Sequence, residues 1–133
     1  MVWAVPGSAH ELALRYLLEL SADIRGALLL DRGGRLLASA GHLQPGDLAG
    51  VAGRLASAAG ALSPNGAPRT AIEIDVFSEG GVMFLVAEAD HVMSCVTNRS
   101  VNPGLIFYDM HAVLRDLDRA AAAEALREPR GDR

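Results

Sequence analysis

Hydrophobic and polar positions repeat with two different periods along this chain, and together they predict three helices and five strands. The first helix begins after Ser8, which with Glu11 forms a capping box that satisfies free backbone amides at a helix start. Four side chains recur at helical spacing, and we expect them to face the core: Leu12, Tyr16, Leu17 and Leu20. A strand from Ile24 to Leu30 and another from Arg35 to Ala40 follow, joined by a glycine-containing turn suited to a tight hairpin.

The second helix is predicted to start near Asp47, whose carboxylate suits the first turn, and to end near Leu62. Its core stripe should contain Leu48, Val51, Leu55 and Leu62. Small residues form a second stripe: Gly50, Gly53, Ser57, and Gly60 or Ala61. Each interior glycine costs roughly 1 kcal/mol of helix propensity, so we expect close packing against another backbone to offset that cost. The alternative is compositional drift toward Ala and Gly on a solvated face.

Three strands and a helix make up the second half of the chain. The segment from Thr70 to Val76 alternates polar and apolar residues, which predicts a strand with one solvated face. Val82 to Ala87 and Val92 to Thr97 are apolar on both sides, which indicates strands covered on both faces. Pro103 suits the first turn of the last helix. One face of that helix carries Ile106, Met110, Val113, Leu117 and Ala121.

These elements predict an α/β (α+β) domain in the order α-β-β-α-β-β-β-α, with a five-stranded antiparallel sheet and helices on both faces. A chain of 133 residues can bury one adequate core. We expect a single domain over residues 8–123, with terminal tails at 1–7 and 124–133.

Charge and composition exclude several classes of protein. The net charge is -4 and all twelve basic residues are arginines spread along the chain, which argues against nucleic-acid binding. We find no signal peptide and no apolar run near the roughly 18 residues that a membrane span requires, so we expect a cytoplasmic protein without a membrane partner. The single cysteine, Cys95, lies in an apolar run and fits a reduced compartment.

The chain offers no set of residues arranged for catalysis. Its histidines have no metal-ligand spacing, and its Gly-Gly pairs lack the Lys-Ser/Thr that completes a phosphate loop. We therefore expect no enzyme, no metal and no cofactor, and we look for function in the surfaces. The four histidines are His10, His42, His91 and His111.

The order of the elements resembles that of the roadblock domain family, which includes dynein light chains and bacterial MglB-like proteins. The resemblance rests also on the opening strand, Gly26-Ala-Leu-Leu-Leu-Asp31 with its glycine turn, and on Asn102-Pro-Gly104 before the last helix. It covers about Leu12 to Leu117, and profilin-like and longin-like domains share the layout. It implies a homodimer or heterodimer that binds a small Ras-like GTPase. MglB-like dimers stimulate GTP hydrolysis by pushing the GTPase's own residues into place, without an arginine finger.

In this family the strand that begins near Thr70 pairs with its copy across a two-fold axis while the second helices pack together. The sequence agrees, because that strand has no Pro, Lys or bulge to protect an edge. A register centred on Ile74 would oppose Glu73 to Asp75, whereas one centred on Ile72 opposes Arg69 to Asp75, so we expect the register near Ile72. The expected dimer interface contains Gly50, Gly53, Ser57, Arg69, Ile72, Ile74 and Asp75.

Family geometry also implies a GTPase contact on the outer side of the second helix, at Asp47 and Arg54. Two other functions stay open at this point. A passive scaffold would join proteins through its dimer without changing hydrolysis. A profilin-like small-molecule sensor would need a cavity lined by polar groups, of which the apolar strands give no hint.

Overall fold

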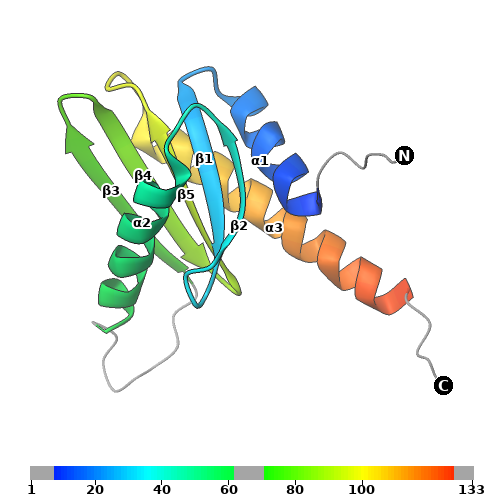
Figure 1. Ribbon diagram of the computed structural model, residues 1–133. Coiled ribbons are helices and arrows are strands. Elements are labelled where there is room, and N and C mark those ends of the chain that lie inside the picture. The colour runs from blue at the N-terminus through cyan, green and yellow to red at the C-terminus, as the bar shows by residue number, and fades with distance from the viewer. Residues whose placement is uncertain (1–7, 62–70, 128–133) are drawn as a thin grey trace.

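The computed structural model describes residues 8–61 and 71–127, and its strands form one antiparallel sheet in the order β2-β1-β5-β4-β3 (Figure 1). The predicted α-β-β-α-β-β-β-α order is confirmed. The helices are α1 (Ala9–Leu20), α2 (Pro45–Gly60) and α3 (Pro103–Arg127). The strands are β1 (Ile24–Asp31), β2 (Leu36–Gly41), β3 (Ala71–Ser78), β4 (Gly81–Glu88) and β5 (His91–Thr97).

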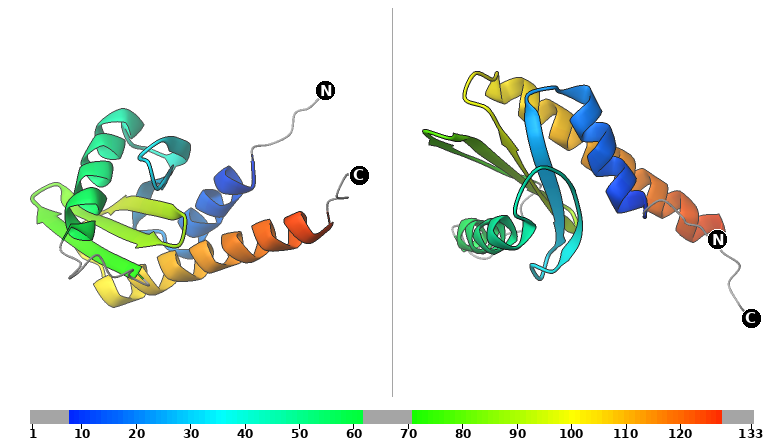
Figure 2. Two further views of the ribbon diagram at one scale, coloured as in Figure 1. Left: turned by 90° about the horizontal axis from the view of Figure 1, so that it is seen from below. Right: turned by 45° about the horizontal axis from the view of Figure 1, so that its top comes forward.

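The helices cover both faces of the sheet, α1 and α3 on one side and α2 on the other (Figure 2). Side chains of β1 alternate between the layers: Ala27 and Leu29 pack toward α1 and α3, and Leu28 and Leu30 pack toward α2. The strands β4 and β5 alternate in the same way, because both lie inside the sheet. This double coverage explains their continuous apolar runs, as predicted.

Helix α1 begins as predicted but buries different side chains. The hydroxyl of Ser8 accepts a hydrogen bond from the backbone N–H of Glu11, whereas the Glu11 carboxylate pairs with Arg15 at 3.1 Å instead of returning to the cap. Leu14 and Leu17 are fully buried. The expectation for three other residues was wrong, because they lie on the exposed side: Leu12, Tyr16 and Leu20.

The β1–β2 hairpin closes with Gly34 at φ +91°, and β2 ends at Gly41 with φ +82°. At Gly41 a Cβ atom would lie 2.5 Å from the carbonyl oxygen of Arg25, so both the backbone angle and the available space require glycine.

Helix α3 starts at Pro103, and the Asn102 side chain accepts a hydrogen bond from the N–H of Leu105 at 3.3 Å, so Asn102 has a structural role. Four residues of the predicted core stripe are buried against the sheet: Ile106, Met110, Val113 and Leu117. The helix continues to Arg127, four residues past the expected end of the domain. In the part of the chain that the structure describes, no helix combines the length and apolar character needed to cross a bilayer.

Candidate functional site

Strand β3 is an edge of the sheet, as predicted, and pairs with β4 along one side only. The turn between them contains two residues, so Ser78 and Gly81 form the hydrogen-bonded pair that closes the hairpin. From this pair onward, hydrogen-bonded and non-hydrogen-bonded residue pairs alternate along the strands, because the register is unbroken. This alternation leaves one set of backbone N–H and C=O groups directed away from β4, at Ala71, Glu73, Asp75 and Phe77.

An apolar groove of about 550 Å³ separates β3 from α2. Ile72 and Ile74 line it from the strand, opposite Leu55 of the helix. Near the β3–β4 turn, β3 also exposes an apolar side chain, because Phe77 is 57% exposed. The structure thus brings together Ile72 and Ile74, two of the expected interface residues, at an edge that also exposes Asp75. The predicted interface residue Arg69 lies outside the described residues.

Helix α2 begins at Pro45, two residues before the predicted start, and Asp47 lies in its first turn. It buries Ala52 fully and packs Leu48 and Leu55 against the sheet. Val51 was expected in this stripe, but it is 37% exposed, because the helix turns smaller alanine side chains toward the strands.

The small-residue stripe of α2 is open over part of its length. Gly50 and Ser57 are exposed, and a Cβ atom at Gly53 would meet no atom within 4 Å outside the helix's own backbone. Gly53 and Ser57 also line a hollow of about 300 Å³ beside the β1–β2 turn. The structure does not bring this stripe together with the β3 edge, because Leu55, Ala58 and Ala59 are the α2 residues that face β3.

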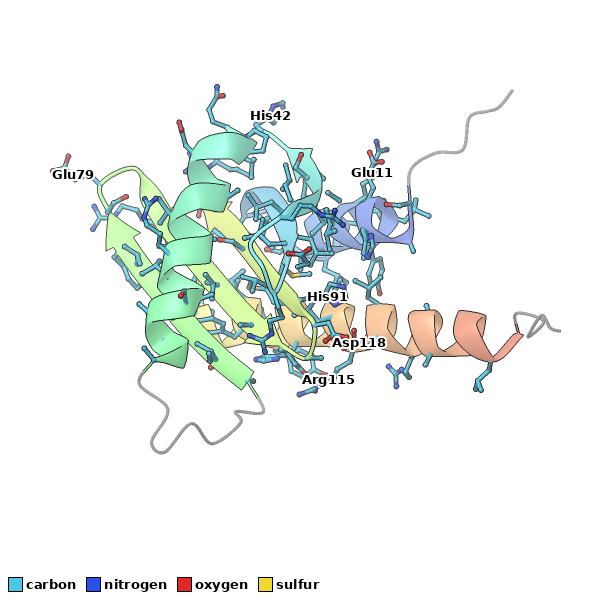
Figure 3. All side chains as sticks on the ribbon, turned by 60° about the horizontal axis from the view of Figure 1, so that its bottom comes forward. Glu11, His42, Glu79, His91, Arg115 and Asp118 are labelled. Atoms are coloured by element: carbon cyan, nitrogen blue, oxygen red, sulfur yellow. The ribbon has the colours of Figure 1, made fainter. Side chains whose placement is uncertain are left out.

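The two residues expected to contact a partner, Asp47 and Arg54, are both exposed on α2. The guanidinium of Arg54 reaches back along the helix toward Gly50. The start of α2 lies beside His42, on the opposite side of the sheet from α3 (Figure 3).

A cluster of charged side chains, which was not predicted from the sequence, lies on the α3 face of the sheet. The His111 ring reaches Glu73 of β3 and Glu88 of β4, each at 2.6 Å. Arg115, one turn further along α3, contacts the other oxygen of Glu88 at 3.4 Å. These residues are far apart in sequence, and no spacing in the sequence signals their contact.

A second part of the same cluster surrounds His91, at the start of β5. Its Nδ1 atom lies 3.3 Å from a carboxylate oxygen of Asp118, without the alignment of a hydrogen bond (Figure 3). The ring of His10 on α1 meets the His91 ring edge to face at 5.6 Å between centroids. Burial, and secondarily the charge of His91, lowers the pKa of His10. In the described residues, no group of three or more His, Cys, Asp or Glu side chains is arranged to hold a metal ion.

Cys95 is buried on β5 against the sulfur of Met110, and burial raises the pKa of its thiol to about 12. Because the thiolate is the reactive form, we expect an aromatic disulfide reagent at about pH 8 to leave the folded protein unlabelled while it labels the denatured protein completely. Absorbance of the released thiol measures both reactions. Labelling of the folded protein at the denatured rate would contradict this burial.

Comparison with known proteins yields matches in structure but not in sequence. No protein-family model matches the chain, and no curated protein matches it. The roadblock/LC7 domain from Streptomyces avermitilis matches with a TM-score of 0.68 at 16% identity, covering 84% of this chain and 97% of that one. The gliding protein MglB from Thermus thermophilus matches with a TM-score of 0.68 at 22% identity, covering 90% of this chain and 95% of that one.

A further solved structure, MglB with a tetrameric arrangement, matches with a TM-score of 0.67 at 23% identity, covering 90% of this chain and 94% of that one. At these identities the likeness concerns the fold. The element order, the sheet topology and these three structures agree, and the chain has the roadblock fold.

Proposed function

We propose that this protein is a dimeric regulator that binds a small Ras-like GTPase and stimulates GTP hydrolysis without catalytic residues of its own. The observation that carries the proposal is the open, partly apolar edge of β3, which lies next to an apolar groove along α2. Unprotected edges of this kind tend to be paired. The roadblock fold supports the proposal, because the resemblance to MglB-like proteins implies a small GTPase as the partner.

In the proposed dimer, β3 pairs with its copy in the antiparallel sense, with the register centred near Ile72. Arg69 of one copy then lies opposite Asp75 of the other, which avoids the opposition of Glu73 to Asp75. Where α2 meets its copy beside the paired strands, the contact uses the β3 side of the helix, at Ala58 and Ala59, because Gly53 and Ser57 line the hollow on the β1–β2 side. The tetrameric arrangement of a solved MglB with the same fold supports self-association of this kind.

The GTPase binds the outer side of α2 in this proposal. Arg54 is exposed there and can meet an acidic group on the GTPase. We expect Arg54→Glu to weaken GTPase binding by on the order of tenfold, because it replaces an attraction with a repulsion across the interface. Calorimetry or fluorescence anisotropy with a labelled nucleotide measures this loss.

The matched control is Arg99→Glu, which makes the same charge reversal on the exposed connection between β5 and α3. It should leave the affinity unchanged at equal ionic strength. Equal affinities of the Arg54→Glu and unaltered proteins would remove Arg54 from the contact.

Single-turnover hydrolysis tests the function directly. The purified protein is mixed with small Ras-like GTPases encoded near its gene, each loaded with GTP, and phosphate release is followed with and without the protein. A regulator accelerates release and binds one nucleotide state preferentially. Binding that is equal for the GDP and GTP states, with unchanged hydrolysis, would instead identify a passive scaffold.

A further inference from the structure

His111 links α3 to two strands of the sheet through carboxylates on both sides of its ring. Nδ1 lies 2.6 Å from Glu88 of β4, and Nε2 lies 2.6 Å from Glu73 of the edge strand β3. The His111 and Glu88 side chains are 13% and 16% exposed, whereas that of Glu73 is 47% exposed. The ring therefore joins a nearly buried acid to an acid on the open edge.

Both contacts require a hydrogen on the ring nitrogen, because an ionised carboxylate can only accept. A neutral imidazole carries one N–H, and only the imidazolium carries two. The two contacts can therefore form together only when both ring nitrogens carry a hydrogen. Loss of one proton would place a nitrogen lone pair against a carboxylate oxygen, which is repulsive, and one of the two contacts would open.

Other charged groups face this site from every neighbouring element. On β3, Asp75 lies on the same face as Glu73, two residues further along the strand. On α3, Arg115 contacts the second oxygen of Glu88 and compensates part of its charge. Glu88 has this additional cation, whereas the structure gives Glu73 only its contact with His111 among the described residues.

On β5, His91 pairs with Glu88 across the β4–β5 ladder and lies near Asp118 of α3. His10 of α1 contacts the His91 ring. Because the pKa of His10 is lowered, its contribution to folding stability is complete above its unfolded-state pKa and is lost as the pH falls.

We propose that protonation of His111 regulates self-association through the β3 edge. In each copy, the imidazolium of His111 holds Glu73 against α3 and compensates the charge of that carboxylate. Deprotonation removes the positive charge beside Glu73 and leaves that carboxylate uncompensated on each copy, at an edge that already carries Asp75. The dimer is therefore stronger with His111 protonated. This inference rests on the proposed pairing through β3.

Sedimentation equilibrium at about pH 6 and about pH 8, which lie below and above the ordinary imidazole pKa of about 6.5, tests the regulation. We expect the dimer of the unaltered protein to dissociate on the order of tenfold more readily at the higher pH, since two uncompensated acids are then brought together. His111→Gln should remove this dependence, because glutamine stays neutral throughout. The matched control, His42→Gln on the other side of the sheet, should keep it.

Nitrogen-15 chemical shifts of the His111 ring, together with hydrogen exchange of the β3 amides, report on the contact itself. The nitrogen-15 shifts should show hydrogens on both ring nitrogens at the lower pH. Hydrogen exchange of the β3 amides, corrected for intrinsic rates, should be faster at the higher pH. A dimer whose dissociation constant is equal at both pH values would overturn the regulation and leave the proposed dimer standing. A protein that stays monomeric at both values would overturn the dimer and the regulation together.

Discussion

Substituting Asp75 with proline is expected to convert the proposed dimer into a monomer. The backbone N–H of Asp75 points away from β4, so proline removes a donor from the open edge without removing a bond of the β3–β4 ladder. By symmetry the dimer loses two hydrogen bonds, each contributing about 1 kcal/mol, and the ring also obstructs approach. We expect the dissociation constant to increase by at least about 30-fold, measured by light scattering after gel filtration across a concentration series.

Asp75→Thr is the control for this change, because it removes the same carboxylate but keeps the amide and suits a strand. It should remain a dimer. Circular dichroism should show that the proline variant keeps its fold. A proline variant that dimerises as tightly as the threonine variant would contradict pairing through β3.

Asp75→Arg then distinguishes the two registers by the sign of its effect. Centred on Ile72, the new arginine faces Arg69 of the other copy and weakens the dimer. Centred on Ile74, it faces Glu73 and strengthens the dimer. Cross-strand pairs contribute roughly 0.2–1 kcal/mol each and occur twice, so we expect a change in the dissociation constant of about 2- to 30-fold.

The second large effect is expected at Phe84, on the α1 and α3 side of β4. Its side chain is fully buried, and its ring meets Phe107 edge to face at 5.1 Å between centroids. Phe84→Ala removes this contact and leaves a cavity, which should lower the free energy of unfolding by about 3–5 kcal/mol. Chemical denaturation at fixed protein concentration measures the loss, which is a large share of the roughly 5–15 kcal/mol that stabilises a typical domain.

Phe77→Ala is the matched control, since it makes the same change on the exposed end of β3. Surface changes of this kind usually alter stability by less than about 0.5 kcal/mol. An equal decrease in the free energy of unfolding for the two variants would contradict the burial of Phe84 in the core.

The strands could be predicted from the sequence because their signal is local. Runs such as Val82 to Ala87 are apolar at every position, and only an inner strand covered on both faces buries all of them. Turn residues such as Gly34 and the Pro103 helix start are also fixed by conformational preferences of single residues. These features do not depend on how the layers later pack.

The buried faces of the helices were harder to predict. In α1 apolar side chains occur around much of the helix, so spacing alone did not separate Leu14, which is buried, from Leu12 and Tyr16, which are exposed. The latter two line an apolar groove beside α3. In α2 the alanines that face the sheet gave a weaker signal than Val51, which does not. Small residues are favoured where a helix lies close to a sheet. A prediction based on hydrophobicity alone ranks valine above alanine and therefore misses them.

The sequence by itself determined the order of the elements, the inner strands, and the weakly protected edge at β3, because periodicity, turn chemistry and the lack of edge protection are properties of neighbouring residues. Only the tertiary structure decided that His111 lies between Glu73 and Glu88, and that His10, His91 and Asp118 share one surface. These contacts join residues separated by 23 or more positions, so they exist only once α1 and α3 have packed on the sheet. Their energies depend on distances that the folded layers set, which no local pattern encodes.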